Sequence, residues 1–543
     1  MKKLLFKLTA LTVLIGFVVS GCRNPAYDIN VLFDAAVIQY KATMILTDAA
    51  GGTLPTSGLT ATITGTDAAS IYDFSGTKAV PVVNGIITLG VTPKDIPTAS
   101  KTLSFNVTIT APGYDTKIIP VTIAVNQFGQ IINVTLLKTV VPTPASSVVA
   151  VEIPTNPTTG ASTAVATFAT PSTGNVPQQT SITVPAGTIF RNAAGAALIG
   201  GAVTAQAVNF DASDPLSLSL FPGGELSSSN VTLPGGTTGG AFFFPAGFTQ
   251  IEMFVGGVQV RNFSTPITVG MQLDETFKPQ ATGVALKTGD VLGIYSYADN
   301  AFKFETNATV IRDAAGKLAV SFQTNHLTVF ICGDAVPTAA CKAATVTFSA
   351  SWLAQGTAPL SVQIISADGT KILATETVIV GDGSKTLFDG VPPVGYRYKV
   401  IYPTTGATLA EGAVNNGCTG GDYTITVGAP GGAPVVSVSL VLGVVCPGKG
   451  VISVPDFDLF YRPAGSTGAF QLLGTASKGQ LRTVLLTVGQ RYDFRANWGT
   501  QTKFVYNRLI SSADQSTTVG DGIYLGDKDP NGNKALLIEA CKN

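Results

Sequence analysis

The sequence predicts an all-β protein built of tandem β-sandwich domains. Short runs rich in Val, Ile, Thr and Phe recur about every ten residues, separated by Gly, Asn, Asp and Pro. Within each run apolar and polar residues alternate, which is typical of strands with one buried face, and no stretch keeps a helical period. Examples are Leu59–Gly65, Leu103–Ala111, Ile118–Ala124 and Ile131–Leu137. Strands at this spacing build sandwiches of about 100 residues, so 543 residues predict several domains.

The composition excludes several classes of protein. Charged residues make up 12% of the chain, against an average near ~25%, while the hydrophobic share of 45% is enough to give each domain a core. Lys+Arg and Asp+Glu balance at 33 each, so no net charge favours nucleic acid. The chain has one histidine, which removes most metal sites and most imidazole catalysis. We therefore expect no metal, no cofactor and no nucleic-acid partner.

The N-terminus has the features of an export signal. Three lysines lie within the first seven residues, and the apolar run Leu8–Val19 is too short to span a bilayer core of about 30 Å. The run ends in Val19-Ser20-Gly21-Cys22, which resembles the lipobox of bacterial lipoproteins. The resemblance implies cleavage of residues 1–21 as a signal peptide, acylation of Cys22 by fatty acids such as palmitate, and a lipidated tether over 22–26. A soluble secreted protein with an incidental Cys22 is the alternative.

A lipid anchor also predicts a location. No later segment reaches about 18 uninterrupted apolar residues, so we expect no other membrane span. Arg23 and Asn24 follow the cysteine, without the aspartate that indicates inner-membrane retention in lipoproteins. We therefore expect anchoring in the outer membrane. The sequence leaves open whether the body faces the periplasm or the cell surface.

Turn-rich joints divide the mature chain into four domains, which we expect to follow one another in a rod. The expected domains are residues 27–138, 148–334, 341–445 and 446–543, with a Pro/Ser/Thr-rich linker at 139–147. Ala111-Pro112-Gly113-Tyr114, followed by two strands, resembles the transthyretin-like, carboxypeptidase-regulatory type of domain, which implies a seven-stranded sandwich. The third and fourth domains resemble further Ig-like sandwiches.

The second domain resembles another family. Ser181–Ile189, Thr265–Leu273 and Phe304–Val310 resemble conserved segments of ZU5-type domains. The closing hexamer Asn325–Phe330 resembles the self-cleavage site of GAIN-type and ZU5-type domains.

That second resemblance implies a self-cleavage reaction. His326 would be the general base, Thr328 the nucleophile, and Leu327–Thr328 the bond that breaks. The alternative, which we favour, is that His326 is a structural histidine on a terminal strand and that the protein is not an enzyme. Other catalytic motifs are missing, including G-x-S-x-G, phosphate-binding loops and H-E-x-x-H.

The cysteines predict disulfides. An exported chain can form them, and five cysteines besides Cys22 lie near the ends of strands or domains: Cys332, Cys341, Cys418, Cys446 and Cys541. Their spacing does not decide connectivity, and a Cys332–Cys341 clip between the second and third domains is one arrangement. A zinc site is disfavoured because there is no C-x-x-C.

Asp527–Gly532 begins like a calcium loop, but Ile538 stands where a glutamate is needed, so we expect a tight turn.

Aromatic side chains identify the remaining candidate site. Carbohydrate binding needs exposed rings, and the alternation over 491–498 predicts that Tyr492, Phe494 and Trp498 face the core. Phe457, Phe460 and Tyr461 are the better surface candidates, and a glycan site would use Phe460, Tyr461 and Trp498. Our main expectation is a structural, adhesive or complex-scaffolding lipoprotein of the cell envelope with a protein partner. A glycan-binding lipoprotein of a polysaccharide-uptake system is the alternative.

Overall fold

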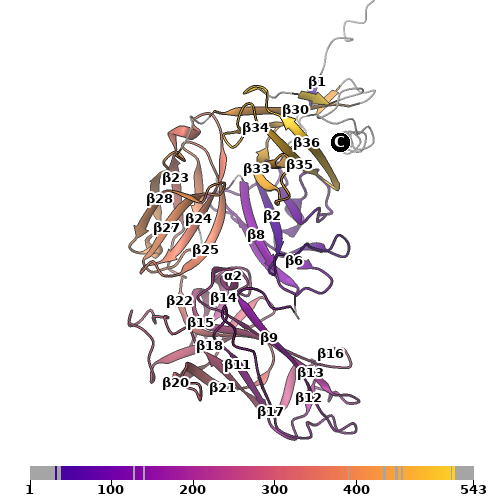
Figure 1. The fold of residues 1–543 in the computed structure, drawn as a ribbon, viewed down its shortest axis with the longest axis vertical. Coiled ribbons are helices and arrows are strands. Elements are labelled where there is room, and N and C mark those ends of the chain that lie inside the picture. Colours follow the sequence, from indigo (N-terminus) through magenta and orange to yellow (C-terminus); the bar gives the residue numbers. More distant parts are fainter. Residues whose placement is uncertain are drawn as a thin grey trace, which may run out of the picture. The chain divides into compact units, whose positions relative to one another are not determined.

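The computed structural model of the chain is nearly all β, which confirms the predicted fold class (Figure 1). It describes residues 31–33, 38–125, 127, 129–138, 141–388, 390–431, 436–446, 451–453, 456–514 and 517–519. In that part of the chain, helix is confined to α2 (Pro215–Ser219) and the 3-10 turns Ala68–Ser70, Ser351–Leu353 and Gly417–Thr419. None of these described helices is long and apolar enough to cross a bilayer. The signal peptide, Cys22, Cys541 and the turn at 527–532 lie outside the described residues.

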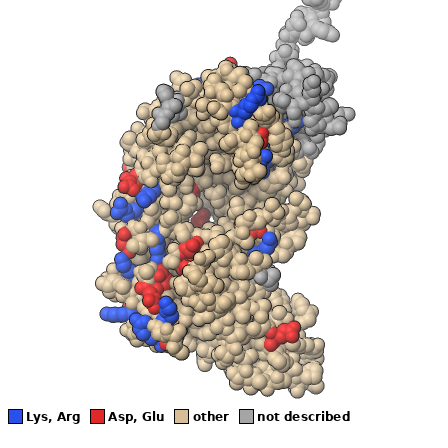
Figure 2. All heavy atoms as spheres, in the orientation of Figure 1, with Lys and Arg blue, Asp and Glu red and all other residues tan. Residues whose placement is uncertain are grey.

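The chain divides into two compact units. One unit is Ile38–Val435, and the other combines Met1–Val37 with Val436–Asn543. On the face shown in Figure 2, uncharged residues cover most of the surface, and the charged side chains of both signs form small, separate groups. This agrees with the low charged fraction and the balanced count of the sequence.

The first domain of Ile38–Val435 is a sandwich of seven strands. The strands are β2 (Lys41–Asp48), β3 (Thr60–Thr64), β4 (Ile71–Tyr72), β5 (Ile86–Val91), β6 (Leu103–Thr110), β7 (Lys117–Ile123) and β8 (Gly129–Leu136). They form the sheets β8-β2-β5-β4 and β3-β6-β7. On β6 the alternation predicted from sequence is realised, because Leu103, Phe105, Val107 and Ile109 are buried between the sheets.

The Ala111–Tyr114 motif forms a turn that fastens this domain. Gly113 has a φ of +78°, a conformation that side chains with a Cβ rarely adopt. The turn presents Tyr114, whose hydroxyl donates to Asp48 at 2.6 Å, and Lys138 Nζ lies 2.9 Å from the same carboxylate. Burial acts to raise the pKa of Asp48, but the bonds from Tyr114 and Lys138 outweigh it and hold that pKa below its usual value. The motif is therefore structural.

The second domain contains two larger sheets. One has the order β10-β11-β17-β21-β20 with β12 paired to β17, and the other has β14-β19-β18-β22-β15-β13-β9 with β16 paired to β15. The first sheet consists of β10 (Ala166–Ala169), β11 (Thr180–Val184), β12 (Phe190–Arg191), β17 (Asn262–Gln272), β20 (Ile311–Arg312) and β21 (Leu318–His326). The second consists of β9 (Ser146–Ile153), β13 (Val203–Phe210), β14 (Ser227–Thr232), β15 (Thr238–Val255), β16 (Val258–Gln259), β18 (Val291–Ala298), β19 (Ala301–Thr309) and β22 (Val329–Pro337). Buried phenylalanines, among them Phe221, Phe243 and Phe248, fill the core.

The third domain shares a sheet with the first. Its strands are β23 (Ala344–Ser349), β24 (Ala358–Ser366), β25 (Ile372–Val380), β26 (Lys385–Phe388), β27 (Tyr396–Tyr402), β28 (Ala407–Val414) and β29 (Gly421–Thr426). β26-β23-β29 form one sheet, and β28-β27-β24-β25 continues through β8 into the first domain. The join is the pairing of Thr377 with Ile131, beside which Asn133 Nδ2 donates to Thr377 Oγ1 at 3.0 Å.

The second unit contains the C-terminal strands and one short N-terminal strand. They are β1 (Val31–Phe33), β30 (Val438–Cys446), β31 (Val451–Ser453), β32 (Phe457–Pro463), β33 (Gln471–Ala476), β34 (Gln480–Thr483), β35 (Arg491–Trp498), β36 (Gln501–Leu509) and β37 (Thr517–Val519). β30 was expected to close the third domain, but it pairs with β31, β34 and β37. The boundary expected at Cys446 therefore lies earlier, at Val436.

Candidate functional sites

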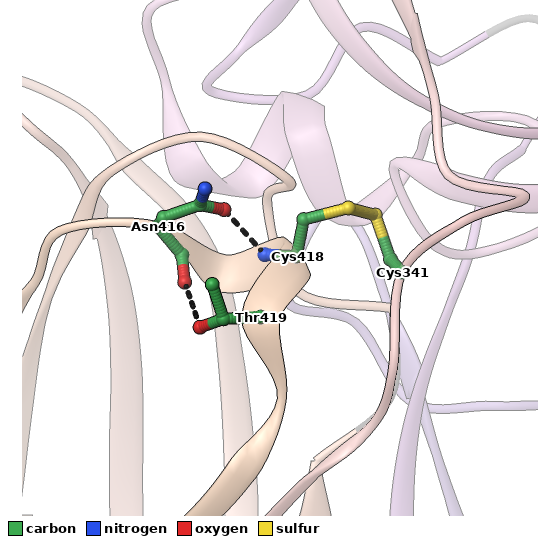
Figure 3. The surroundings of a disulfide bond; sticks show 4 residues. All are labelled: Cys341, Asn416, Cys418 and Thr419. Carbon is green, nitrogen blue, oxygen red and sulfur yellow. Dashed lines mark hydrogen bonds between the residues drawn. A yellow bond between two sulfur atoms is a disulfide. The ribbon is translucent and has the colours of Figure 1, made fainter.

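A disulfide joins Cys341 to Cys418 in the third domain (Figure 3). Cys341 precedes β23, and Cys418 lies in the 3-10 turn before β29, so the bridge fastens the starts of two strands that pair in parallel. Asn416 Oδ1 accepts from the Cys418 N–H at 2.8 Å and shapes the turn. The prediction of a bridge in this set of cysteines is confirmed.

The alternative Cys332–Cys341 clip is wrong, because Cys341 is bonded elsewhere. Cys332 is a free, fully buried thiol on β22. Burial, with a smaller effect of Asp334, raises the pKa of this thiol far above its usual value, so it is a core residue and no nucleophile. The side chains of Cys446 and Cys541 lie outside the described residues.

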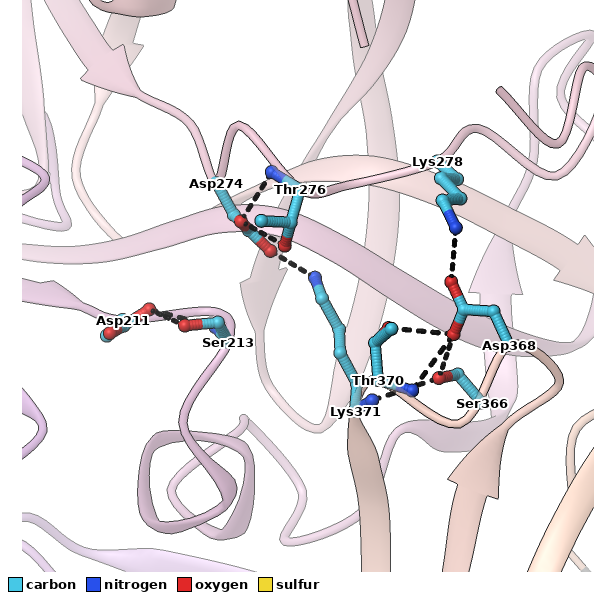
Figure 4. Close-up of polar contacts among 9 residues, drawn as sticks. All are labelled: Asp211, Ser213, Asp274, Thr276, Lys278, Ser366, Asp368, Thr370 and Lys371. Carbon is cyan, nitrogen blue, oxygen red and sulfur yellow. Dashed lines mark hydrogen bonds and ion pairs between the residues drawn. The ribbon is translucent and has the colours of Figure 1, made fainter. Parts of the chain in front are cut away.

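Two ion pairs connect the second and third domains (Figure 4). Lys371 of the third domain pairs with Asp274, which follows β17, and these side chains are only 12% and 4% exposed. Burial acts to raise the pKa of Asp274, but the charge and hydrogen bond of Lys371 outweigh it, so this pKa lies below its usual value. Lys278 lies 2.7 Å from Asp368 at a more exposed position. Removing one partner of the buried pair would leave an uncompensated charge, a change that typically costs about 3–5 kcal/mol.

Hydrogen bonds connect the first and second domains. Lys117 Nζ donates to the carbonyl of Ser219 at 3.0 Å, and Gln250 Nε2 donates to Asp115 at 2.9 Å. On the same strand as Gln250, burial and then the nearby Asp115 raise the pKa of Glu252 to about 7. Burial also raises the pKa of Asp115 and lowers that of Lys117 to about 8.

The first three domains therefore contact one another pairwise. The first and third share a sheet, the second and third share ion pairs, and the first and second share hydrogen bonds. Leu373 of β25 also belongs to the buried cluster of the second domain. The expectation of a rod, in which only consecutive domains touch, is wrong for these three domains.

His326 ends β21 and interacts with an acidic side chain. Its Nε2 lies 3.4 Å from Glu305 Oε1, and the Ser296 hydroxyl donates to the same oxygen at 2.7 Å. In a hydrolytic triad the imidazole lies between hydroxyl and carboxylate, whereas here the carboxylate lies between the other two. The arrangement links β21, β19 and β18 and differs from that of a triad.

Thr328 is also hydrogen-bonded to neighbouring strands. Its hydroxyl donates to the backbone carbonyl of Tyr297 on β18, and its own carbonyl accepts from the Ile251 N–H at 3.2 Å. Leu327 between the two residues is buried. The three residues implied for self-cleavage are neighbours in the chain, but the polar groups of His326 and Thr328 bond to different strands. This supports the structural alternative.

The expected aromatic surface of the last domain is not where the sequence placed it. Phe460 and Tyr461 are 1% and 4% exposed, so the expectation that they present open rings is wrong; the side chain of Trp498 is not described. Tyr492 and Phe494 are buried, as predicted. Among the described aromatic side chains of this sheet, Tyr506 on β36 is the exposed one, at 54% exposure, and the sequence analysis missed it.

Comparisons with known proteins identify no family. No protein-family model and no curated protein matches the chain. The Bacillus anthracis TIE protein is similar over 79% of this chain and 76% of its own, at 9% identity and a TM-score of 0.14. GBS52, the minor pilin of Streptococcus agalactiae, is similar over 33% of this chain and 94% of its own, at 9% identity and a TM-score of 0.12. BcpA, the major pilin subunit of Bacillus cereus, is similar over 72% of this chain and 99% of its own, at 9% identity and a TM-score of 0.13. TM-scores this low support no conclusion about family or function.

The disulfide leads to a stability prediction. Replacing Cys341 and Cys418 together by serine should lower the free energy of unfolding of the third domain by about 2–5 kcal/mol, measured by chemical denaturation. Non-reducing peptide mapping of the unmodified protein should recover these two cysteines in one cross-linked peptide pair. Two alkylatable thiols at these positions in the oxidised protein would contradict the assignment.

The contacts of His326 and Thr328 predict an intact chain. Purified mature protein should run as one polypeptide on a denaturing gel, and Thr328→Ala should leave that pattern unchanged, because the hydroxyl is bonded to Tyr297. Two fragments, one beginning at Thr328 by N-terminal sequencing and absent from the variant, would show that the bond is cut.

Glu252 predicts a pH-dependent stability. Its pKa is near 4.5 when unfolded and about 7 when folded. Between these values the folded state keeps a proton that the unfolded state has lost, so stability falls as pH rises through this window. Glu252→Gln should therefore stabilise the chain by about 1–3 kcal/mol at pH 8 and hardly at all at pH 4. Denaturation curves at both pH values measure the free energy of unfolding of each protein. An equal effect of the substitution at pH 4 and pH 8 would show that the raised pKa of Glu252 is not the cause.

Proposed function

We propose that the protein is an outer-membrane-anchored lipoprotein with a structural, adhesive or complex-scaffolding role in the bacterial cell envelope, and that it is not an enzyme. Its mature chain would begin at the acylated Cys22, and its partner would be another envelope protein.

The pairwise contact of the first three domains supports this proposal most directly. Domains joined only in sequence move independently unless their interfaces hold them. Here a shared sheet at Ile131 and Thr377, a buried ion pair at Asp274 and Lys371, and the bonds of Lys117 hold all three. A body fixed in this way suits a part that transmits force or spaces a binding surface.

The polar groups of the second domain fit the same role. His326, Ser296 and Thr328, which would be the obvious groups for catalysis, each bond to a neighbouring strand. Hydrogen bonds of this kind stabilise the packing of a β-sandwich, and this role requires no substrate. Among the described residues, no cluster of three or more His, Cys, Asp or Glu side chains has a geometry suited to a metal ion.

Replacing the anchor residue tests the proposal in cells. Cys22→Ala should abolish fatty-acid labelling and release the protein from the outer-membrane fraction, because several acyl chains supply the attachment at about 0.8 kcal/mol per buried methylene. In a deletion strain, the released variant should be exported yet fail to restore the adhesion or envelope integrity that the unmodified gene restores.

A matched control is Arg23→Ala, which changes the neighbouring residue and should stay labelled and membrane-bound. If Cys22→Ala remains labelled and in the outer membrane, the lipoprotein assignment is wrong. If the released variant restores the phenotype fully, the anchored structural role is wrong.

A further inference from the structure

One face of the sheet β33-β32-β35-β36 carries alternating aromatic and arginine side chains. Phe460, Arg495 and Phe504 lie directly opposite one another on β32, β35 and β36, so all three project from this face. Phe470, from the turn before β33, lies against the same group, with its ring centroid 5.9 Å from that of Phe504. Tyr506 continues the row, with its ring stacked parallel to Phe504 at 5.8 Å.

The exposure of this row increases along it. Phe460 is buried at its inner end, Phe470 and Phe504 are half-buried, and Tyr506 is 54% exposed. Two of the rings therefore rest on the sheet and present part of their surface, while the last ring is open to solvent. A ligand lying along this face would therefore contact more than one ring.

Arg495 is the unusual member of the group. Its guanidinium carbon lies 4.4 Å from the ring centre of Phe460 and 5.5 Å from that of Phe470, so the charge sits between two rings. Its Nε is buried without a hydrogen-bond partner, and no described carboxylate forms an ion pair with it. Desolvation lowers the pKa of this guanidinium.

Arg462 provides an internal comparison. It stacks on the same Phe470 ring at 4.4 Å, but its Nε donates to Asp493 at 3.1 Å and its Nη1 to the Gly468 carbonyl at 3.0 Å. Two arginines therefore share one aromatic ring, and only one of them has an anionic partner. Guanidinium groups bind carboxylates through paired N–H groups, and among the described residues no carboxylate makes such a contact with Arg495.

We propose that this face of the C-terminal unit binds an acidic polysaccharide, with Arg495 bonding a sugar carboxylate and Phe470, Phe504 and Tyr506 contacting successive sugar rings. Aromatic rings present a flat apolar surface to the C–H faces of sugars, and the unpaired guanidinium supplies the charge complement. Neutral polysaccharides lack the carboxylate and would bind weakly, because a few ring contacts must offset the entropy of association. The proposal goes beyond the structural role and does not depend on it.

Polygalacturonate, whose units each carry one carboxylate, is the probe. Calorimetry with the full mature protein should detect binding to it, and no binding to dextran, to carboxyl-reduced polygalacturonate or to polyglutamate. Arg495→Met should weaken binding roughly tenfold or more, since it removes a charged hydrogen-bond donor. Methionine packs well between aromatic rings, so this variant should stay folded.

Two further variants separate the site from general charge effects. Tyr506→Ala lies at an exposed position and should weaken binding severalfold without changing thermal stability. Arg397→Met removes an equal charge from an exposed position of the third domain and should leave binding unchanged. Absence of polygalacturonate binding, equal binding of the reduced polymer or of polyglutamate, or equal losses in Arg495→Met and Arg397→Met would each overturn the proposal.

Discussion

The pairing of β8 with β25 is the constraint on which the rest of Ile38–Val435 depends. It makes one sheet run from the first domain into the third, although some 240 residues separate Ile131 from Thr377. The second domain lies between them in sequence, so its two ends must return to the same place. β9 begins at Ser146, shortly after β8 ends, and β22 ends at Pro337, shortly before β23 begins. Short connections at both ends bring the second domain against both of its neighbours.

These contacts among the three domains explain where the few charged residues of Ile38–Val435 form buried ion pairs. A chain with 12% charged residues has few ion pairs to place, and isolated surface pairs contribute little, about 0–1 kcal/mol. Among the ion pairs of the described residues, Asp274 with Lys371 is the most buried, and it lies between two domains. This ion pair helps to fix the relative position of the two domains, because any other arrangement would leave a buried charge without its partner. Lys117 has the same effect between the first two domains, where its ammonium group bonds to Ser219.

Strands were predictable from sequence because the alternation of side chains is local. Leu103–Ala111 corresponds to β6 at Leu103–Thr110, and Ile118–Ala124 to β7 at Lys117–Ile123. What covers each face is not local information. Alternation placed Tyr492 and Phe494 on the buried face of their strand, which is correct. It did not reveal that Phe460, opposite Arg495 on the neighbouring strand, is buried as well.

The non-local features had no comparable signal. The β8–β25 pairing involves ordinary strand residues, and nothing in the Thr377 segment distinguishes it from other edges. The Cys341–Cys418 bridge was within the predicted set, but spacing cannot choose among the arrangements of five cysteines. The Asn325–Phe330 hexamer shows the limit of a local motif. His326 ends β21 and Thr328 lies in the bend before β22, and each interacts with a different strand, His326 with Glu305 of β19 and Thr328 with Tyr297 of β18. The six residues alone do not show these partners.

Arg495 shows how a structure separates stability from function. Stability alone would favour an apolar side chain between Phe460 and Phe470, since burying a guanidinium without an anion costs free energy that packing does not return. Arg462 avoids that cost on the same ring through Asp493. The Phe470 ring therefore contacts one arginine with a carboxylate partner and, among the described residues, one without. The acidic ligand proposed above would supply an anion to Arg495, beside a row of rings that opens to solvent at Tyr506.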